Sequence, residues 1–243
     1  METSRRVRHC FGMKSIRVAS YNIRKAIGTD RRRNPERVLE VLNEIDADVI
    51  ALQEADRRFG VRSAAIPPLL LDSLSPYKPV PLNVQVDSMG WHGNAILVRK
   101  EAEIGAHDVL HLPCLEPRGA TMAEVTLAGK TMRFFGMHLD LSGLWRRRQA
   151  AAVIHAAGVR ETMPTVLMGD LNEWSANRGC LADFARHYSF APCGRSFHAR
   201  RPVAQLDRIM HCGQLKLLDC GVHDSAAARK ASDHLPIWAE FRA

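Results

Sequence analysis

The chain has 243 residues, of which 46% are hydrophobic and 25% are charged. These proportions are ordinary for a globular protein with a buried core, and no stretch approaches the ~20 consecutive apolar residues of a membrane-spanning helix. The net charge of +8 favours an anionic partner, such as nucleic acid, an anionic lipid surface or a phosphorylated small molecule. A solvated basic surface gives the same net charge, so charge alone does not choose among these.

The N-terminal segment 1–14 is basic but lacks the apolar run of ~7–15 residues that a secretory signal needs. We expect it to be a disordered tail, followed by one domain over residues 15–243. The six cysteines form neither a C-x-x-C pair nor a cluster with zinc-ligand spacing, which favours free thiols. We therefore expect a cytoplasmic protein, and a monomer.

The first half of the domain begins with a β-α-β pattern. Residues 16–23 alternate as a strand does, and Asn34 followed by Pro35 is typical of a helix start. The helix is predicted by apolar residues at i, i+3, i+4 and i+7, namely Val38, Val41, Leu42 and Ile45. Residues 49–52 then form a short apolar run, which indicates a strand buried under helices.

The rest of the chain is predicted to be rich in short strands, with one long helix at 144–160 that carries three consecutive arginines. The predicted strands are 94–98, 121–127, 131–137, 165–168, 206–210 and 235–241. The second and third of these flank a turn at 128–130 and are predicted to form a hairpin.

Polar residues capable of chemistry follow these strands directly. They are Asn22, Glu54, His138, Asp170, Asn172, Asp233 and His234. Because ligand groups converge at one end of the sheet in α/β architectures, we expect these side chains to meet around one pocket.

Asp170 and Asn172 lie two residues apart after a predicted strand, so in extended backbone both side chains project to the same side. The carboxylate can accept a proton from water, and the amide can donate to a phosphoryl oxygen. An Asx turn after a strand explains the same tetrapeptide equally well.

Ser232-Asp233-His234-Leu235-Pro236 is the sharpest local signal, because it places a carboxylate beside an imidazole before the last strand. The histidine can donate to a phosphate or exchange a proton near neutral pH. Asp207 is predicted to orient that imidazole, the alternative being a salt bridge between Asp207 and Arg208. Glu54 offers a carboxylate of the kind that Mg²⁺ prefers, although a single surface carboxylate at a strand end is the simpler interpretation.

Seven short motifs resemble, in the same order, those of the endonuclease/exonuclease/phosphatase superfamily. They are Tyr21-Asn22-Ile23, Gln53-Glu54, Gly93-Asn94-Ala95, His138-Leu139, Gly169-Asp170-Leu171-Asn172, Leu206-Asp207-Arg208-Ile209 and Ser232-Asp233-His234-Leu235-Pro236. The resemblance covers nearly the whole chain. It implies a four-layer α/β sandwich, in which two mixed β-sheets pack face to face with helices on the outside.

The resemblance also implies a metal-dependent phosphoesterase with particular roles for its residues. The metal, Mg²⁺ or Mn²⁺, would be held by Glu54 with Asn22 and Asp233. Catalysis would use His138, Asp170, Asn172, Asp207 and His234. The substrate would also be bound by Asn94 and by Arg118, whose guanidinium offers a planar fork of donors to a phosphate.

The substrate stays open at this point, between nucleic acid and a phospholipid or inositol phosphate. For the second, the chain also resembles small bacterial members of the superfamily, some akin to proteins of lipid-anchor remodelling, through Glu116-Pro117-Arg118-Gly119 and Ser196-Phe197-His198. Arginines at 31–33, 146–148 and 200–201 would suit a nucleic-acid groove, whereas the apolar run 66–71 would suit a lipid-facing lip. The sequence around His138 departs from the abasic-site branch of the superfamily. A catalytically inactive phosphate-binding module is a third alternative, disfavoured because Glu54 and the Asp233-His234 pair are present.

Overall fold

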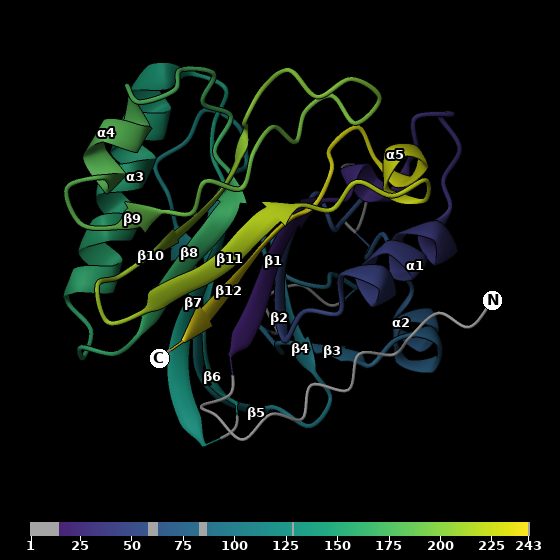
Figure 1. The fold of residues 1–243 in the computed structure, drawn as a ribbon, viewed down its shortest axis with the longest axis horizontal. Helices are drawn as coiled ribbons and strands as arrows, with labels where there is room; N and C mark the ends of the chain where they lie inside the picture. Colours follow the sequence, from purple (N-terminus) through teal and green to yellow (C-terminus); the bar gives the residue numbers. More distant parts are fainter. Residues whose placement is uncertain (1–14, 58–62, 83–86, 128, 243) are drawn as a thin grey trace.

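The computed structural model describes residues 15–57, 63–82, 87–127 and 129–242. Two six-stranded β-sheets pack face to face, and helices lie on the outer sides (Figure 1). The prediction of an α/β sandwich with two mixed sheets is therefore confirmed. The predicted tail, residues 1–14, lies outside the described residues. A single domain over 15–243 stays a prediction.

The first sheet contains the two strands of the N-terminal β-α-β unit at its centre. Its order is β11 (Lys216–Val222), β12 (Ile237–Arg242), β1 (Ile16–Asn22), β2 (Val49–Gln53), β4 (Ala95–Arg99) and β3 (Tyr77–Pro79). β1 and β2 are parallel, and the remaining neighbours are antiparallel. The predicted strands lie within about two residues of β1, β2, β4 and β12, whereas β3 and β11 were not predicted.

The second sheet is built around the predicted hairpin. Its order is β5 (Glu103–His111), β6 (Gly119–Leu127), β7 (Lys130–His138), β8 (Thr165–Asp170), β10 (Asp207–His211) and β9 (Ser189–Phe190). β6 and β7 pair antiparallel from Gly119 opposite His138 to Leu127 opposite Lys130, which confirms the hairpin. β7 and β8 are parallel, so both end at the same edge of the sheet.

Helices cover the outer face of each sheet (Figure 1). On the first sheet lie the 3-10 turn η1 (Arg24–Ala26) and the helices α1 (Pro35–Ile45), α2 (Pro68–Leu74) and α5 (Ala228–Ala231). On the second lie α3 (Gly143–Gly158) and α4 (Cys180–Phe184). The predicted start of α1 is confirmed, because the Asn34 side chain accepts a hydrogen bond of 2.7 Å from the Arg37 backbone N–H.

The hydrophobic core consists of three layers, one between the sheets and one under each set of helices. The layer between the sheets contains Val18, Val49, Phe134, Val166 and Ile209. Side chains alternate between the two faces of a strand, so every second residue from these core positions also faces the space between the sheets. Four of the predicted site residues occupy such positions, namely Asn22, His138, Asp170 and Asp207.

The described helices are all too short or too polar to cross a bilayer. The described cysteines, Cys114, Cys180, Cys193, Cys212 and Cys220, are free thiols, in agreement with the expectation from their spacing.

Candidate active site

The predicted site residues meet where strands of the two sheets end side by side. His138 and Asp170 are the last residues of the parallel strands β7 and β8 and stand opposite each other in the register. Asp207, the first residue of β10, stands opposite Asp170 from the other side. Asn22, the last residue of β1, connects the sheets, because its Nδ2 donates to Asp170 Oδ2 over 3.0 Å.

Asp170 lies at the centre of this group and is 1% exposed. Its Oδ2 is 3.4 Å from His138 Nε2 and 3.7 Å from His234 Nε2. Burial raises the pKa of Asp170, but the two histidines and the hydrogen bonds from Asn22 and the Asn172 backbone outweigh burial and lower it. The carboxylate is therefore ionised, and both histidines, the Asn22 amide and the Asn172 N–H stabilise its charge.

His234 is held by Asp207, as the sequence predicts. Its Nδ1 lies 2.9 Å from Asp207 Oδ2, which also accepts a hydrogen bond from the Ser196 hydroxyl. Burial lowers the pKa of His234, but the carboxylates of Asp207 and Asp170 outweigh burial and raise it to about 10. The alternative salt bridge is not formed, because Arg208 donates to the backbone carbonyl of Asp207 and not to its carboxylate.

His138 contacts Asp170 as His234 does, but its imidazole is neutral whereas that of His234 is protonated. Burial lowers the pKa of His138 to about 4, since the attraction of Asp170 does not compensate for the loss of water. Arg118 Nη1 lies 2.7 Å from His138 Nε2 and adds a positive charge that keeps the imidazole neutral. The site thus holds a neutral histidine and a protonated histidine on either side of one carboxylate.

Glu54 follows β2 and faces a cavity of about 200 Å³ that Lys25, Arg118 and His138 also line. Its carboxylate forms an ion pair with the Lys25 ammonium. Burial raises the pKa of Glu54, but His138, Lys25 and Arg118 outweigh burial and lower it. The cavity therefore presents an ionised carboxylate to which a cationic group is already bound.

The backbone around this cavity is strained. Glu54 has φ 52°, Lys25 has φ 57° and His92 has φ 48°, values in the left-handed region that non-glycine residues rarely adopt. Each costs about 1–3 kcal/mol and persists only where the surroundings impose it. The Lys25 N–H donates to the Glu54 carbonyl over 2.9 Å, which fixes these two strained residues together.

Two groups of residues could hold a divalent metal. Ligand atoms of Asp170, Asp207 and His234 lie within 4.8 Å of one another, but His234 Nδ1 and Asp207 Oδ2 are hydrogen-bonded to each other. Glu54 instead offers an oxygen ligand beside a cavity, and the Lys25 ammonium occupies the place of a cation against it. Because Mg²⁺ prefers carboxylate oxygens and retains several waters, its chemistry fits the Glu54 side better.

The other predicted residues are placed less simply. Asp233 Oδ2 lies 3.2 Å from Arg24 Nε, and Asn22 Oδ1 accepts from the Arg24 backbone N–H over 3.0 Å. The Asn172 N–H donates to Asp170 Oδ1, which forms the Asx turn; binding of a phosphoryl group by the Asn172 side chain stays a prediction. The Asn172 amide donates to the Leu139 carbonyl over 2.9 Å.

Asn94 is fully buried, and its amide donates to the carbonyls of Gly119 and Trp91. These contacts tie β4 to β6 across the two sheets. Its Oδ1 has no hydrogen-bond partner within the described part of the chain. Binding of substrate by Asn94 stays a prediction.

Sequence reasoning missed several residues that border the site. The contacts of Ser196 with Asp207 and of Lys25 with Glu54 are what place these two residues at the site. Phe197 lies with its ring centroid 4.9 Å from that of His234, and Trp174 stands edge-on to Phe197 at 6.0 Å. Trp174 is 65% exposed, an unusual position for a tryptophan.

The model of the Endonuclease/Exonuclease/phosphatase family matches residues 19–234, which include all of these strand ends. The chain belongs to this family. Its members are metal-dependent phosphoesterases, so the resemblance inferred from seven motifs is confirmed. No curated protein matches the chain.

Solved structures share the fold at low sequence identity. An endonuclease/exonuclease/phosphatase family protein of Bacteroides thetaiotaomicron superposes with a TM-score of 0.75, is 18% identical, and the match covers 96% of each chain. A mannosyl-6-phosphatase of the same organism has a TM-score of 0.73 at 19% identity, covering 93% of this chain and 99% of its own. D. rerio TDP2 complexed with a single-strand DNA product has a TM-score of 0.73 at 16% identity, covering 94% and 99%.

Proposed function

We propose that this protein is a Mg²⁺- or Mn²⁺-dependent hydrolase that cleaves a phosphodiester by attack of water. The observation that carries the proposal is the placement of the Asp170 carboxylate between His138 and His234, with Asp207 behind His234. Ionised oxygen and fixed donors converge there from five separate segments. Such preorganised donors are what a transition state of phosphoryl transfer requires.

Each side chain then has a distinct task. Asp170 positions the attacking water and accepts its proton. His234, whose Nδ1 is held by Asp207, donates to a phosphoryl oxygen from Nε2. His138 and Arg118 approach the phosphate from the other side, and Asn172 and Asn94 complete its binding.

Glu54, with Asn22 and Asp233, would hold the metal. A divalent cation there would neutralise charge that develops on the phosphate oxygens and lower the pKa of a water. Lys25 and Arg24 are bound to two of these ligands, so both cationic side chains would move or share the site when metal binds. A metal site would explain why Arg24 and Lys25, both with positive φ, lie directly against carboxylates.

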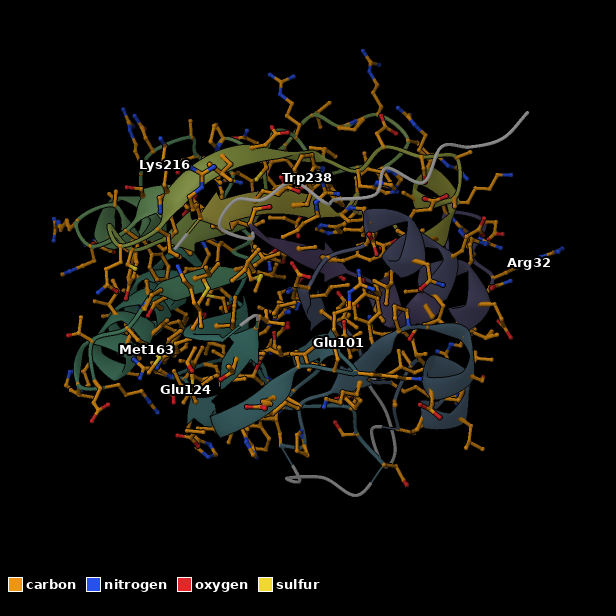
Figure 2. All side chains as sticks on the ribbon, turned by 60° about the horizontal axis from the view of Figure 1, so that its bottom comes forward. Arg32, Glu101, Glu124, Met163, Lys216 and Trp238 are labelled. Carbon is orange, nitrogen blue, oxygen red and sulfur yellow. The ribbon has the colours of Figure 1, made fainter. Side chains whose placement is uncertain are left out.

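A nucleic acid is the substrate that the surroundings of the site favour. The exposed Trp174 and the half-buried Phe197, which lies beside His234, form an aromatic pair suited to stacking on a base. The segment that follows Phe197 is basic, and Arg200 donates to the Thr29 carbonyl, which brings it to the basic loop 31–33. Figure 2 shows Arg32 of that loop extending away from the fold into solvent.

Two of the three arginines of α3 are engaged elsewhere. Arg146 is buried against Glu173, and Arg147 pairs with Asp183. Arg148 is exposed and lies over the Trp145 ring, so it remains a predicted nucleic-acid contact together with the arginines at 31–33 and 200–201.

The alternative substrate, a phospholipid or inositol phosphate, loses one of the two features that suggested it, the apolar lip. The apolar run 66–71 leads into α2, where Leu71 is buried and Leu69 exposed, and none of these residues lines the cavity at Glu54. Inositol phosphates need no apolar lip, so a substrate panel has to include them.

Hydrolysis of a bis-aryl phosphate ester tests the proposed chemistry. We expect activity with Mg²⁺ or Mn²⁺, none after chelation, and none in Glu54→Ala. Asp170→Ala and His234→Ala should each lower turnover at least ~10²-fold. Asp108→Ala is a matched control, because this carboxylate lies exposed on β5 in a pair with Arg160. Near-normal turnover in Asp170→Ala or His234→Ala would refute the assignment.

A substrate panel tests the nucleic-acid preference. It contains supercoiled DNA, single-stranded RNA, phosphoinositides, sphingomyelin and cardiolipin. We expect cleavage of a nucleic acid, reduced in Trp174→Ala mainly through a higher KM, because stacking contributes about 1–3 kcal/mol per base. Cleavage of a lipid alone, with Trp174→Ala unaffected, would replace the nucleic acid by the alternative.

A further inference from the structure

Arg208, on β10 beside Asp207, is a buried cation that forms no ion pair with a carboxylate of the described residues, although the charges of Asp207 and Asp170 favour its protonated state. The side chain is 7% exposed, and its guanidinium donates through Nη1 to the carbonyls of Gln205 and Asp207. Burial lowers the pKa of Arg208, yet a guanidinium stays protonated under any ordinary condition. A buried charge without a counter-ion is costly, so its presence calls for a partner.

The other two buried arginines of the described chain show what such a partner normally is. Arg133 Nη2 lies 2.7 Å from Glu124 Oε1, and Arg146 Nη2 lies 3.2 Å from Glu173 Oε2. Both pairs are hydrogen-bonded through a second guanidinium nitrogen as well. Arg208 is therefore the one buried arginine of the described chain that is not paired with a glutamate or an aspartate.

A cavity of about 280 Å³ lies against Arg208 and is lined by residues of α4, β9 and the start of β10. Figure 1 shows where these three elements lie. Leu181, Phe190 and Pro192 contribute apolar walls, and Asn177 and Gln205 contribute polar groups. The volume is slightly below the range of about 300–1,000 Å³ for ligand pockets. Only Asp207 of the proposed catalytic residues reaches this cavity, which does not include Glu54, Asp170 or His138.

We propose that this cavity binds a small organic anion, whose carboxylate or phosphate group pairs with the Arg208 guanidinium. The apolar part of the ligand packs against Leu181 and Phe190, and Asn177 and Gln205 are placed to hydrogen-bond its polar groups. The cavity adjoins Asp207, which in turn holds His234, so the ligand would occupy a site next to the catalytic dyad without replacing the substrate.

Binding of two simple probes tests the proposal by calorimetry, with no dependence on catalytic activity. Benzoate carries a carboxylate on an apolar ring, phenylphosphonate carries a phosphate-like group that cannot be hydrolysed as an ester, and benzamide is the neutral control. We expect at least one anion to bind, and benzamide to bind at least ~10-fold more weakly, because a hydrogen bond to a charged group contributes about 1.5–3 kcal/mol. The probe that binds more tightly identifies the anionic group.

Variants locate the binding. Arg208→Met should weaken the bound anion at least ~10-fold. Arg208→Lys, which retains the charge, should bind with an intermediate Kd. Ala185→Trp places a large ring at an exposed position that lines the cavity, and should block binding without touching Arg208. Arg118→Ala is the matched control for anion binding in the active site and should leave the Kd unchanged.

Three results would overturn the proposal. They are absence of binding of either anion to the wild-type protein at millimolar concentration, an unchanged Kd in Arg208→Met, and loss of binding in Arg118→Ala. If Arg208→Met does not fold, Arg208→Lys and Ala185→Trp decide between the same outcomes. Because all measurements report binding at Arg208, they remain valid if the enzyme proves to have another substrate.

Discussion

Replacing Asp207 by Asn should remove much of a pH-dependent contribution to the folding stability. His234 ordinarily titrates at 6.5, but in the folded protein its pKa is raised to about 10 by Asp207, 2.9 Å away, and by Asp170. At about 1.4 kcal/mol for each pH unit, this difference corresponds to ~5 kcal/mol. The imidazole is almost fully buried, so solvent does not screen the interaction strongly.

The sign follows from proton binding in the two states. Between pH 6.5 and about 10, the folded state binds the His234 proton and the unfolded state does not. The contribution is therefore fully present below pH 6.5 and declines as the pH rises to about 10. Burial also raises the pKa of Asp207, which costs stability above the ordinary range of a carboxyl and offsets part of the gain. The informative quantity is therefore the slope of the unfolding free energy against pH between pH 6.5 and about 10.

Urea unfolding of the wild-type and Asp207→Asn proteins, both treated with chelator, measures this slope between pH 6 and 10. The difference in unfolding free energy between them should shrink by about 1 kcal/mol for each pH unit above 6.5. Titration of thiols and tyrosines affects both proteins and cancels in the difference. If the unfolding free energies of the two proteins change in parallel with pH over this range, Asp207 does not raise the pKa of His234 in the folded state.

Three further substitutions test the packing that supports the site. Tyr21→Phe should leave the unfolding free energy unchanged or raise it by about 1 kcal/mol, because the buried Tyr21 hydroxyl has no hydrogen-bond partner among the described residues. A clearly lower unfolding free energy in chemical denaturation would show that the hydroxyl does form a hydrogen bond. Arg146→Met should destabilise by about 3–5 kcal/mol, because it leaves Glu173 buried and uncompensated; the double variant with Glu173→Leu should recover much of the loss, and no recovery would contradict the pairing. Asn34→Ala should lower the unfolding free energy by about 1 kcal/mol through loss of the α1 cap, whereas Asn34→Asp should preserve it, and equal Tm values for both variants would argue against the cap.

The sequence predicted the elements whose signals are local. Asn34 and Pro35 marked the start of α1, and short apolar runs marked the central strands. It did not predict the edge strand β11 or the long strand β5, whose residues are largely exposed and therefore form no apolar run. Both are edge strands, each hydrogen-bonded to one neighbour only, β12 and β6 respectively, and this backbone pairing leaves no apolar pattern in the sequence.

For the site, the sequence identified the residues at the strand ends, and the motifs predicted their family. Only the tertiary structure decided their states. His138 is neutral and His234 protonated, although both are buried histidines near Asp170, because one faces Arg118 and the other Asp207. A pKa depends on burial and on charges within a few ångströms, and neither quantity is encoded by position along the chain.

The same reason explains why Arg208 became notable only in three dimensions. In the sequence it stands next to Asp207, and a salt bridge between them was the simple alternative. In a strand, neighbouring side chains point to opposite faces, so Asp207 turns toward His234 and Arg208 toward the cavity beside α4. Local pattern thus determined which residues lie at the strand ends, and the packing of two sheets and their helices determined what each of those residues contacts.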